Sequence, residues 1–316
     1  MGISDKPQVS IIMATYNRAH LISESLRSVM NQSFENWECL VIDDGATDET
    51  EKVIEYIGAT DERIVYLKRP GNHKKGLPGC RNYGLDIARG DYVIFFDDDD
   101  IAHPDNLKIC VTELEDKNTS YCRYLKDVFR GEFNLEFDHK LEYSKKILDV
   151  NNLESIVEGV IPFNSCQVMW RRECFIGNYF NEELMYAEEW ECYLRILSKE
   201  VKGISVDKVL FYGRKHLNSN TGEFYTNDPV RRSSYSKAVK LVIENLKKND
   251  LLTAKLKQYF IRMGFFFKDY SIIQHTLAAF NSSTIEKSKY KLGFAFYPLL
   301  KRYFNLANRL RNRTGR

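Results

Sequence analysis

The sequence predicts an α/β protein in which a mixed, mainly parallel sheet is flanked by helices and followed by a C-terminal helical extension. Three observations predict this fold. Short apolar runs alternate with segments of helical periodicity over the first hundred residues. Polar side chains follow the apolar runs directly, and from about residue 229 onward only the helical period remains. Strands that alternate with helices over short links are typical of a parallel sheet covered by helices.

The individual elements follow from these patterns. Residues 9–14 read as a buried strand, and residues 21–30 place apolar side chains at helical spacing. The segment 47–50 opens a helix, because its acidic residues lie where the helix dipole stabilises negative charge. The other expected strands are 37–42, 64–67, 92–96, 167–170 and 209–212, and the other expected helices are 80–88, 188–198, 236–246, 251–267 and 272–280.

Composition excludes several classes of protein. Apolar residues make up 43% of the 316 residues, which is enough for a sizeable core. The charged fraction of 28% is balanced in sign, which argues against disorder. The net charge of +2 gives no global attraction to nucleic acid, so we expect no nucleic-acid partner. The seven cysteines stand singly without a C-x-x-C pair, so a zinc site is not expected.

The two ends of the chain bear on where the protein acts. No signal-peptide pattern is evident and no stretch approaches the roughly 20 apolar residues of a spanning helix, so we expect a cytoplasmic protein. Residues 301–316 contain six basic residues and no acidic one, with apolar residues interspersed. Such a tail either lies on an anionic membrane, giving peripheral contact at its inner face, or forms a solvated terminal helix.

Polar residues follow three of the expected strands, at 15–17, 43–44 and 97–100. Because ligands of such sheets bind beyond the carboxyl ends of the strands, these residues are expected to converge on one edge. In an extended segment Asp97 and Asp99 would share one face and Asp98 and Asp100 the other. Carboxylates packed so closely repel one another, and a hard divalent ion, Mn²⁺ or Mg²⁺, would relieve that repulsion. A solvated acidic turn is the alternative, which the preceding buried strand disfavours.

An ordered set of motifs resembles a known family. Residues 9–18 (VSIIMATYNR), 41–48 (VIDDGATD), 81–90 (RNYGLDIARG) and 95–100 (FFDDDD) together look like the large inverting glycosyltransferase family 2, which has the GT-A fold. The resemblance covers roughly the first 220 residues. It implies a GT-A catalytic domain at 1–228, with a nucleotide-binding half at 1–104 and an acceptor half at 105–228. Residues 229–316 would then form a helical region with a basic tail.

The resemblance also implies roles for single residues. The family's strand-one motif and the second aspartate of its DDG motif grip the nucleotide, which makes Asp44 the partner of a pyrimidine ring nitrogen. The family's D-x-D motif falls on residues 97–99, with Asp99 as the best metal ligand and Asp97 near the ribose or the metal. His216 lies in a segment similar to the family's Y-R-x-H-x-x-S and is a further metal or phosphate contact. The implied donor-binding residues are Ala14, Tyr16, Asn17, Asp44, Arg81, Asp97 and Asp98, and the implied metal ligands are Asp99, Asp97 and His216.

The family's general base is usually the aspartate of a Glu-Asp pair that opens a late helix. Here Glu189 falls on the base position and Glu188 is its neighbour, so this chain departs from the family by having Glu for Asp. A carboxylate there would deprotonate an acceptor hydroxyl as it attacks the anomeric carbon. An exposed acidic helix start, favoured by the helix dipole, is the alternative.

The combined prediction is an inverting glycosyltransferase that uses a nucleotide-diphosphate sugar, UDP-linked by expectation, and a glycan or lipid-linked acceptor. Two alternatives stay open. One is an inactive scaffold that binds a nucleotide-sugar, which the Glu189 departure supports. The other is a nucleotidyltransferase, which the absence of a glycine-rich phosphate loop with a following lysine disfavours.

Overall fold

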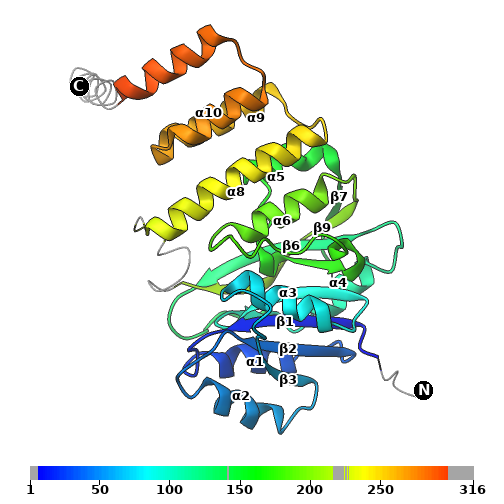
Figure 1. Ribbon diagram of the computed structural model, residues 1–316. Helices are drawn as coiled ribbons and strands as arrows, with labels where there is room; N and C mark the ends of the chain where they lie inside the picture. Colours follow the sequence, from blue (N-terminus) through cyan, green and yellow to red (C-terminus); the bar gives the residue numbers. More distant parts are fainter. Residues whose placement is uncertain (1–5, 141, 216–223, 225, 227, 298–316) are drawn as a thin grey trace, which may run out of the picture. The chain divides into compact units, whose positions relative to one another are not determined.

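The computed structural model describes residues 6–140, 142–215, 224, 226 and 228–297. The chain divides into two compact units, residues 1–238 and residues 239–316. Figure 1 shows the sheet in the first unit and the C-terminal helices that follow it. Helix α8, Pro229–Lys248, begins in the first unit and continues into the second. The functional boundary expected at residue 228 stays a prediction.

The first unit is built on a nine-stranded sheet in the order β3-β2-β1-β4-β8-β6-β9-β5, with β7 paired to β9. Strands β3, β2, β1 and β4 are parallel, whereas β8 runs antiparallel to both β4 and β6. The mixed α/β fold flanked by helices is therefore confirmed. The strands are β1 Val9–Thr15, β2 Trp37–Asp43, β3 Ile64–Lys68, β4 Tyr92–Asp97, β5 Ile101–Ala102, β6 Tyr121–Phe129, β7 Lys145–Leu148, β8 Val168–Arg171 and β9 Gly203–Arg214.

The helices of this unit pack on the sheet, with α3 against β1 and β2 and α4 against β6 and β9 (Figure 1). They are α1 Ile22–Met30, α2 Thr50–Gly58, α3 Leu77–Ile87, α4 Asn106–Glu113, α5 Leu153–Val157 and α6 Glu188–Leu197, with short 3₁₀ turns at Val150–Asn152, Ser165–Gln167 and Arg172–Phe175.

Register explains why the polar residues meet at one edge. Ala14 of β1 lies between Ile42 of β2 and Asp97 of β4, so three parallel strands end at the same level. The strands are buried along nearly their whole length, which matches their continuous apolar runs. The residues that follow these strands therefore share one rim of the sheet.

Helix α3 approaches the sheet closely through a glycine. A Cβ on Gly84 would lie 2.5 Å from Cγ2 of Ile12, so a larger residue would push the helix away from β1. The helix begins three residues earlier than the expected residue 80, because Pro78 fits the first turn, where its missing N–H needs no partner. This close packing fixes the height of Arg81, one turn before Gly84, above the rim.

The second unit contains α9, Ala254–Phe267, α10, Tyr270–Ala279, and a helix over residues 284–297. The side chains of Thr253 and Asp269 cap α9 and α10 by accepting backbone N–H bonds. Buried Ile273 and Leu277 of α10 form a small core with Ile261 of α9. Throughout the described ranges, each helix is too short or too polar to span a bilayer.

Candidate active site

The loops after β1 and β2 are bound to each other. The Asp44 N–H donates to the Thr15 carbonyl at 3.0 Å, which joins the two strand ends. Asn17 adopts φ 54°, a left-handed conformation that asparagine tolerates better than most residues. Its Oδ1 accepts a 2.7 Å hydrogen bond from the Thr47 N–H. Asn17, predicted to bind the donor, thus holds the two loops together, and Ala14 lies in the strand just before them.

The two aspartates after β2 have different environments. Asp43 is buried, and its oxygens accept from the Tyr66 hydroxyl at 2.7 Å and from loop N–H groups. Asp44 accepts from Arg69 Nε at 2.5 Å and from the Gly76 N–H at 3.0 Å. A carboxylate has about four acceptor positions, so Asp44 can still accept a ring N–H from a nucleobase. The role that the resemblance implies for Asp44, as partner of a pyrimidine ring nitrogen, stays a prediction.

Tyr16 presents an aromatic ring at the rim. Its side chain is 45% exposed, and Lys75 Nζ lies 4.7 Å from the ring centroid. An exposed ring at a strand end can stack on a planar base, and a lysine beside it adds positive charge for phosphate. The neighbouring Lys74 instead forms an ion pair with Glu183.

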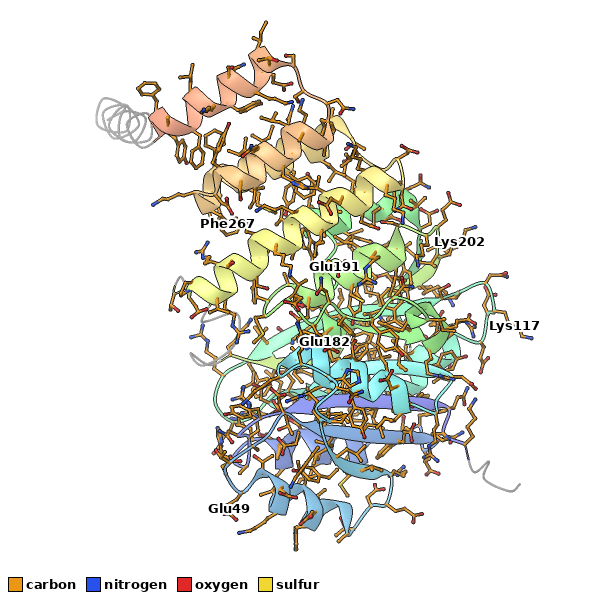
Figure 2. All side chains as sticks on the ribbon, viewed as in Figure 1. Glu49, Lys117, Glu182, Glu191, Lys202 and Phe267 are labelled. Atoms are coloured by element: carbon orange, nitrogen blue, oxygen red, sulfur yellow. The ribbon has the colours of Figure 1, made fainter. Side chains whose placement is uncertain are left out.

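The loop over residues 70–76 is fastened by Glu182, which lies beside α3 in Figure 2. Its carboxylate accepts from the Lys74 N–H at 2.7 Å and from Asn82 Nδ2 at 2.8 Å, and contacts His73 Nδ1 at 2.8 Å. Burial opposes ionisation of Glu182, but these hydrogen bonds outweigh it and lower its pKa. The loop over residues 70–76 is therefore held by an ionised carboxylate.

The acidic run does not continue β4 as an extended segment. The strand ends at Asp97, Asp98 and Asp99 form a turn, and Asp100 follows. The expectation that Asp97 and Asp99 share one face as in a strand is therefore wrong, because residues 98 and 99 are in a turn and not in an extended segment. Carboxylate oxygens of Asp97 and Asp100 and the Cys166 thiol lie within 4.8 Å of one another.

Arg18 compensates part of the acidic run. Its Nε donates to Asp98 Oδ1 at 3.3 Å, and its Nη2 lies 3.7 Å from Asp99 Oδ2. Asp98 is buried, and this burial raises its pKa to about 7, although the Arg18 charge acts in the opposite direction. Asp98, predicted as a donor-binding residue, thus faces protein.

A second cation compensates Asp100. Lys126 Nζ lies 2.8 Å from Asp100 Oδ2 and 3.0 Å from Cys166 Sγ, and the Arg214 N–H donates to Asp100 Oδ1 at 2.7 Å. An ammonium group already stands where a metal would contact two members of this trio, and a thiol is a poor ligand for a hard ion. Asp97, whose side chain is 36% exposed, and Asp99 are the better oxygen donors for Mn²⁺ or Mg²⁺.

Arg81 joins the acidic run to helix α6. The guanidinium is 3% exposed, donates to Glu188 Oε1 at 3.0 Å and lies 3.5 Å from Asp97 Oδ1. The rings of Phe95 and Phe180 lie 5.7 and 5.5 Å from it. Arg81 is thus enclosed by protein on several sides, and it connects the predicted metal side of the rim to Glu188, the neighbour of the predicted base Glu189.

Helix α6 begins at Glu188, after Ala187 in the left-handed conformation with φ 63°. The Ser234 hydroxyl of α8 accepts from the Met185 N–H at 2.8 Å, which fixes the chain just before the helix. Glu188 is buried, and burial together with the charge of Glu189 raises the pKa of Glu188. Glu189 is only partly buried. The exposed start of an acidic helix, the alternative for this pair, thus does not fit Glu188.

Two sequence predictions fall elsewhere. His216 and the basic tail at 301–316 lie outside the described residues. Conversely, Arg18 and Arg69 contact predicted site residues and Lys126 contacts Asp100 of the acidic run, yet the sequence analysis gave these three cations no role. Arg69 follows the end of β3 at the same rim, and that position is a signal that could have found it.

Comparison with known proteins defines the class. The family model for glycosyl transferase family 2 matches residues 10–173, about half of the chain. This chain belongs to glycosyl transferase family 2.

Named relatives are similar over different lengths. The GalNAc(5)-diNAcBac-PP-undecaprenol β-1,3-glucosyltransferase of Campylobacter jejuni is 40% identical over 94 residues, which are 30% of this chain and 30% of that protein. The UDP-Glc:α-D-GlcNAc-diphosphoundecaprenol β-1,3-glucosyltransferase WfaP of Escherichia coli is 28% identical over 245 residues, 73% of this chain and 86% of that protein. The chain therefore spans under a third of the first relative and most of the second.

A solved structure has the same fold. The S. aureus TarS fragment 1–349 in complex with UDP-GlcNAc superposes with a TM-score of 0.61 at 22% identity, covering 79% of this chain and 70% of that one. This likeness supports the GT-A fold.

Proposed function

We propose that this chain is an inverting glycosyltransferase that moves a sugar from a UDP-sugar to a hydroxyl group of a glycan or lipid-linked acceptor. The single observation that carries the proposal is the position of Arg81, which contacts both Asp97 at the end of β4 and Glu188 at the start of α6. This contact supports the proposal, because Asp97 belongs to the proposed donor side and Glu188 adjoins the proposed base Glu189. The relatives are named for action on diphosphoundecaprenol-linked sugars, and these names support a lipid-linked acceptor.

The donor half of the site follows from the rim. Tyr16 stacks on the base, Asp44 accepts its ring N–H, and Lys75 lies toward the diphosphate. Asp99 and Asp97 would hold Mn²⁺ or Mg²⁺, an ion that would neutralise charge on the leaving diphosphate. The rim residues orient the anomeric carbon toward α6.

The acceptor half centres on Glu189, the less buried of the two glutamates. Its carboxylate takes the proton of the acceptor hydroxyl while the hydroxyl oxygen bonds to the anomeric carbon. The bond from that carbon to the diphosphate oxygen breaks in the same displacement, which inverts the anomeric configuration. Glu188 and Arg81 act as positioning residues, because both are buried. Trp190 stacks on Tyr235 at 6.1 Å beside this site and offers an apolar face for a sugar ring.

The test is release of nucleoside diphosphate from a panel of nucleotide-sugars with Mn²⁺ or Mg²⁺. Release from none of them would overturn the proposal. Glu189→Gln should keep donor affinity and lose transfer. If Glu188→Gln is inactive and Glu189→Gln is active, the base is Glu188 and not Glu189.

We further propose that the tail at 301–316 brings the enzyme to the inner face of the membrane.

A further inference from the structure

The helix over residues 284–297 has one face committed to the second unit. Tyr290 and Phe294 pack on the small core of α9 and α10, and Phe294 lies 5.6 Å from Phe265 between ring centroids. Glu286, the one acidic residue in this segment of sequence, pairs with Lys257 at 2.8 Å. The inward face is therefore filled and its charge compensated.

The opposite face carries large apolar side chains in the open. Ile285, Leu292 and Phe296 are 83%, 60% and 55% exposed. Their spacing of seven and four residues puts them on one stripe of the helix. Lys289 falls on the same stripe, and Lys287 and Lys291 lie further round the exposed side. An apolar stripe with lysines beside it is typical of helices that lie in a membrane interface.

Charge separates the two units of the chain. Residues 239–316 contain 16 basic and four acidic residues and so carry +12, although the whole chain carries only +2. Residues 1–238 therefore carry −10. An anionic surface attracts the second unit and repels the first.

We propose that the face formed by Ile285, Leu292 and Phe296, with its lysines, docks on an anionic lipid bilayer. Charge complementarity favours an anionic partner, and the apolar stripe favours lipid over nucleic acid, since phosphate backbones are bound by basic groups without an exposed aliphatic stripe. A second copy of this basic unit would bring like charges together. The proposal goes beyond the tail contact and does not depend on sugar transfer, because docking can be measured without a donor.

The experiment is co-sedimentation of the full chain with vesicles of phosphatidylglycerol and phosphatidylcholine, compared with vesicles of phosphatidylcholine alone. Wild type should sediment with the anionic vesicles, and less so at high salt. The triple variant Ile285→Ser, Leu292→Ser, Phe296→Ser should bind roughly tenfold more weakly, since it loses most of the buried apolar area. All three side chains are exposed, so the variant should keep the wild-type thermal melting curve.

A matched control uses Ile176, which is 78% exposed in the acidic unit. Ile176→Ser should leave vesicle binding unchanged. Equal binding by the triple variant and wild type would overturn the proposal, as would absence of binding to anionic vesicles. Light scattering that shows a dimer lost only in the triple variant, or duplex DNA that competes fully with vesicles, would likewise overturn it in favour of those partners. Deleting residues 301–316 separates the contribution of the tail from that of the apolar stripe. The deletion variant should retain part of the vesicle binding, because its stripe is intact.

Discussion

Replacing Arg81 by methionine tests the connection between the two halves of the site. The guanidinium is 3% exposed and its partner Glu188 is 4% exposed, so the variant leaves a carboxyl group buried with its main partner gone. Breaking such a pair costs about 3–5 kcal/mol when the remaining group is charged. When the carboxyl is protonated, the loss is that of a hydrogen bond to a charged donor, about 1.5–3 kcal/mol.

Burial raises the pKa of Glu188 to about 8, so the loss should be larger at pH 9 than at pH 6. Urea unfolding followed by tryptophan fluorescence measures it, because all three tryptophans, at 37, 170 and 190, lie in the first unit. Lys68→Met is the control, since Lys68 pairs with Glu51 and both side chains are exposed, at 63% and 42%. That control should lose far less stability than Arg81→Met, because an exposed ion pair contributes little. Equal losses for both variants would refute the connecting role of Arg81.

Two further predictions concern the same unit. Because the pKa of Glu188 in the folded state is raised above its ordinary value of 4.5, the contribution of Glu188 to stability is full below pH 4.5 and is lost as the pH rises to about 8. The free energy of unfolding of wild type minus that of Glu188→Gln should therefore fall over this range, and a difference that rises with pH would contradict it. Gly84→Ala should lose about 1–3 kcal/mol through the clash with Ile12, and Gly71→Ala, with nothing within 4 Å, should change stability by about 0.5 kcal/mol or less. Equal urea midpoints for these two glycine variants would show that α3 can shift.

The strands of the first hundred residues could be predicted because they are buried and form continuous apolar runs in the sequence. The strand at 9–14 and the strand at 37–42 each extend by only one residue in the structure. By contrast β6 was missed, although it lies inside the sheet. Its apolar pattern is interrupted by Arg123, which is buried, and by Lys126, which is partly buried. Both have partners from distant segments, such as Ser205 for Arg123.

The site could be predicted from the sequence only in part, for a related reason. Motifs name the carboxylates at the rim, but the cations that compensate them come from other elements, as Arg69 does for Asp44 and Lys126 does for Asp100. The turn over Asp98 and Asp99 likewise depends on the path of the chain after the end of β4. The sequence around a carboxylate does not show which distant cation will pair with it, because charge compensation is a property of the folded arrangement.

Calorimetric titration of UDP into wild type and into Asp99→Asn, each with and without Mn²⁺, tests most directly whether Asp99 holds a metal ion beside the nucleotide. We expect wild type to bind UDP at least about tenfold more tightly with Mn²⁺, since Asp99 and Asp97 would hold an ion that offsets the negative charge of the diphosphate. Asp99→Asn should lose that gain and keep the weaker binding seen without the ion, because Tyr16 and Asp44 are untouched. An equal gain from Mn²⁺ in both proteins would contradict the assignment of the metal to the rim after β4.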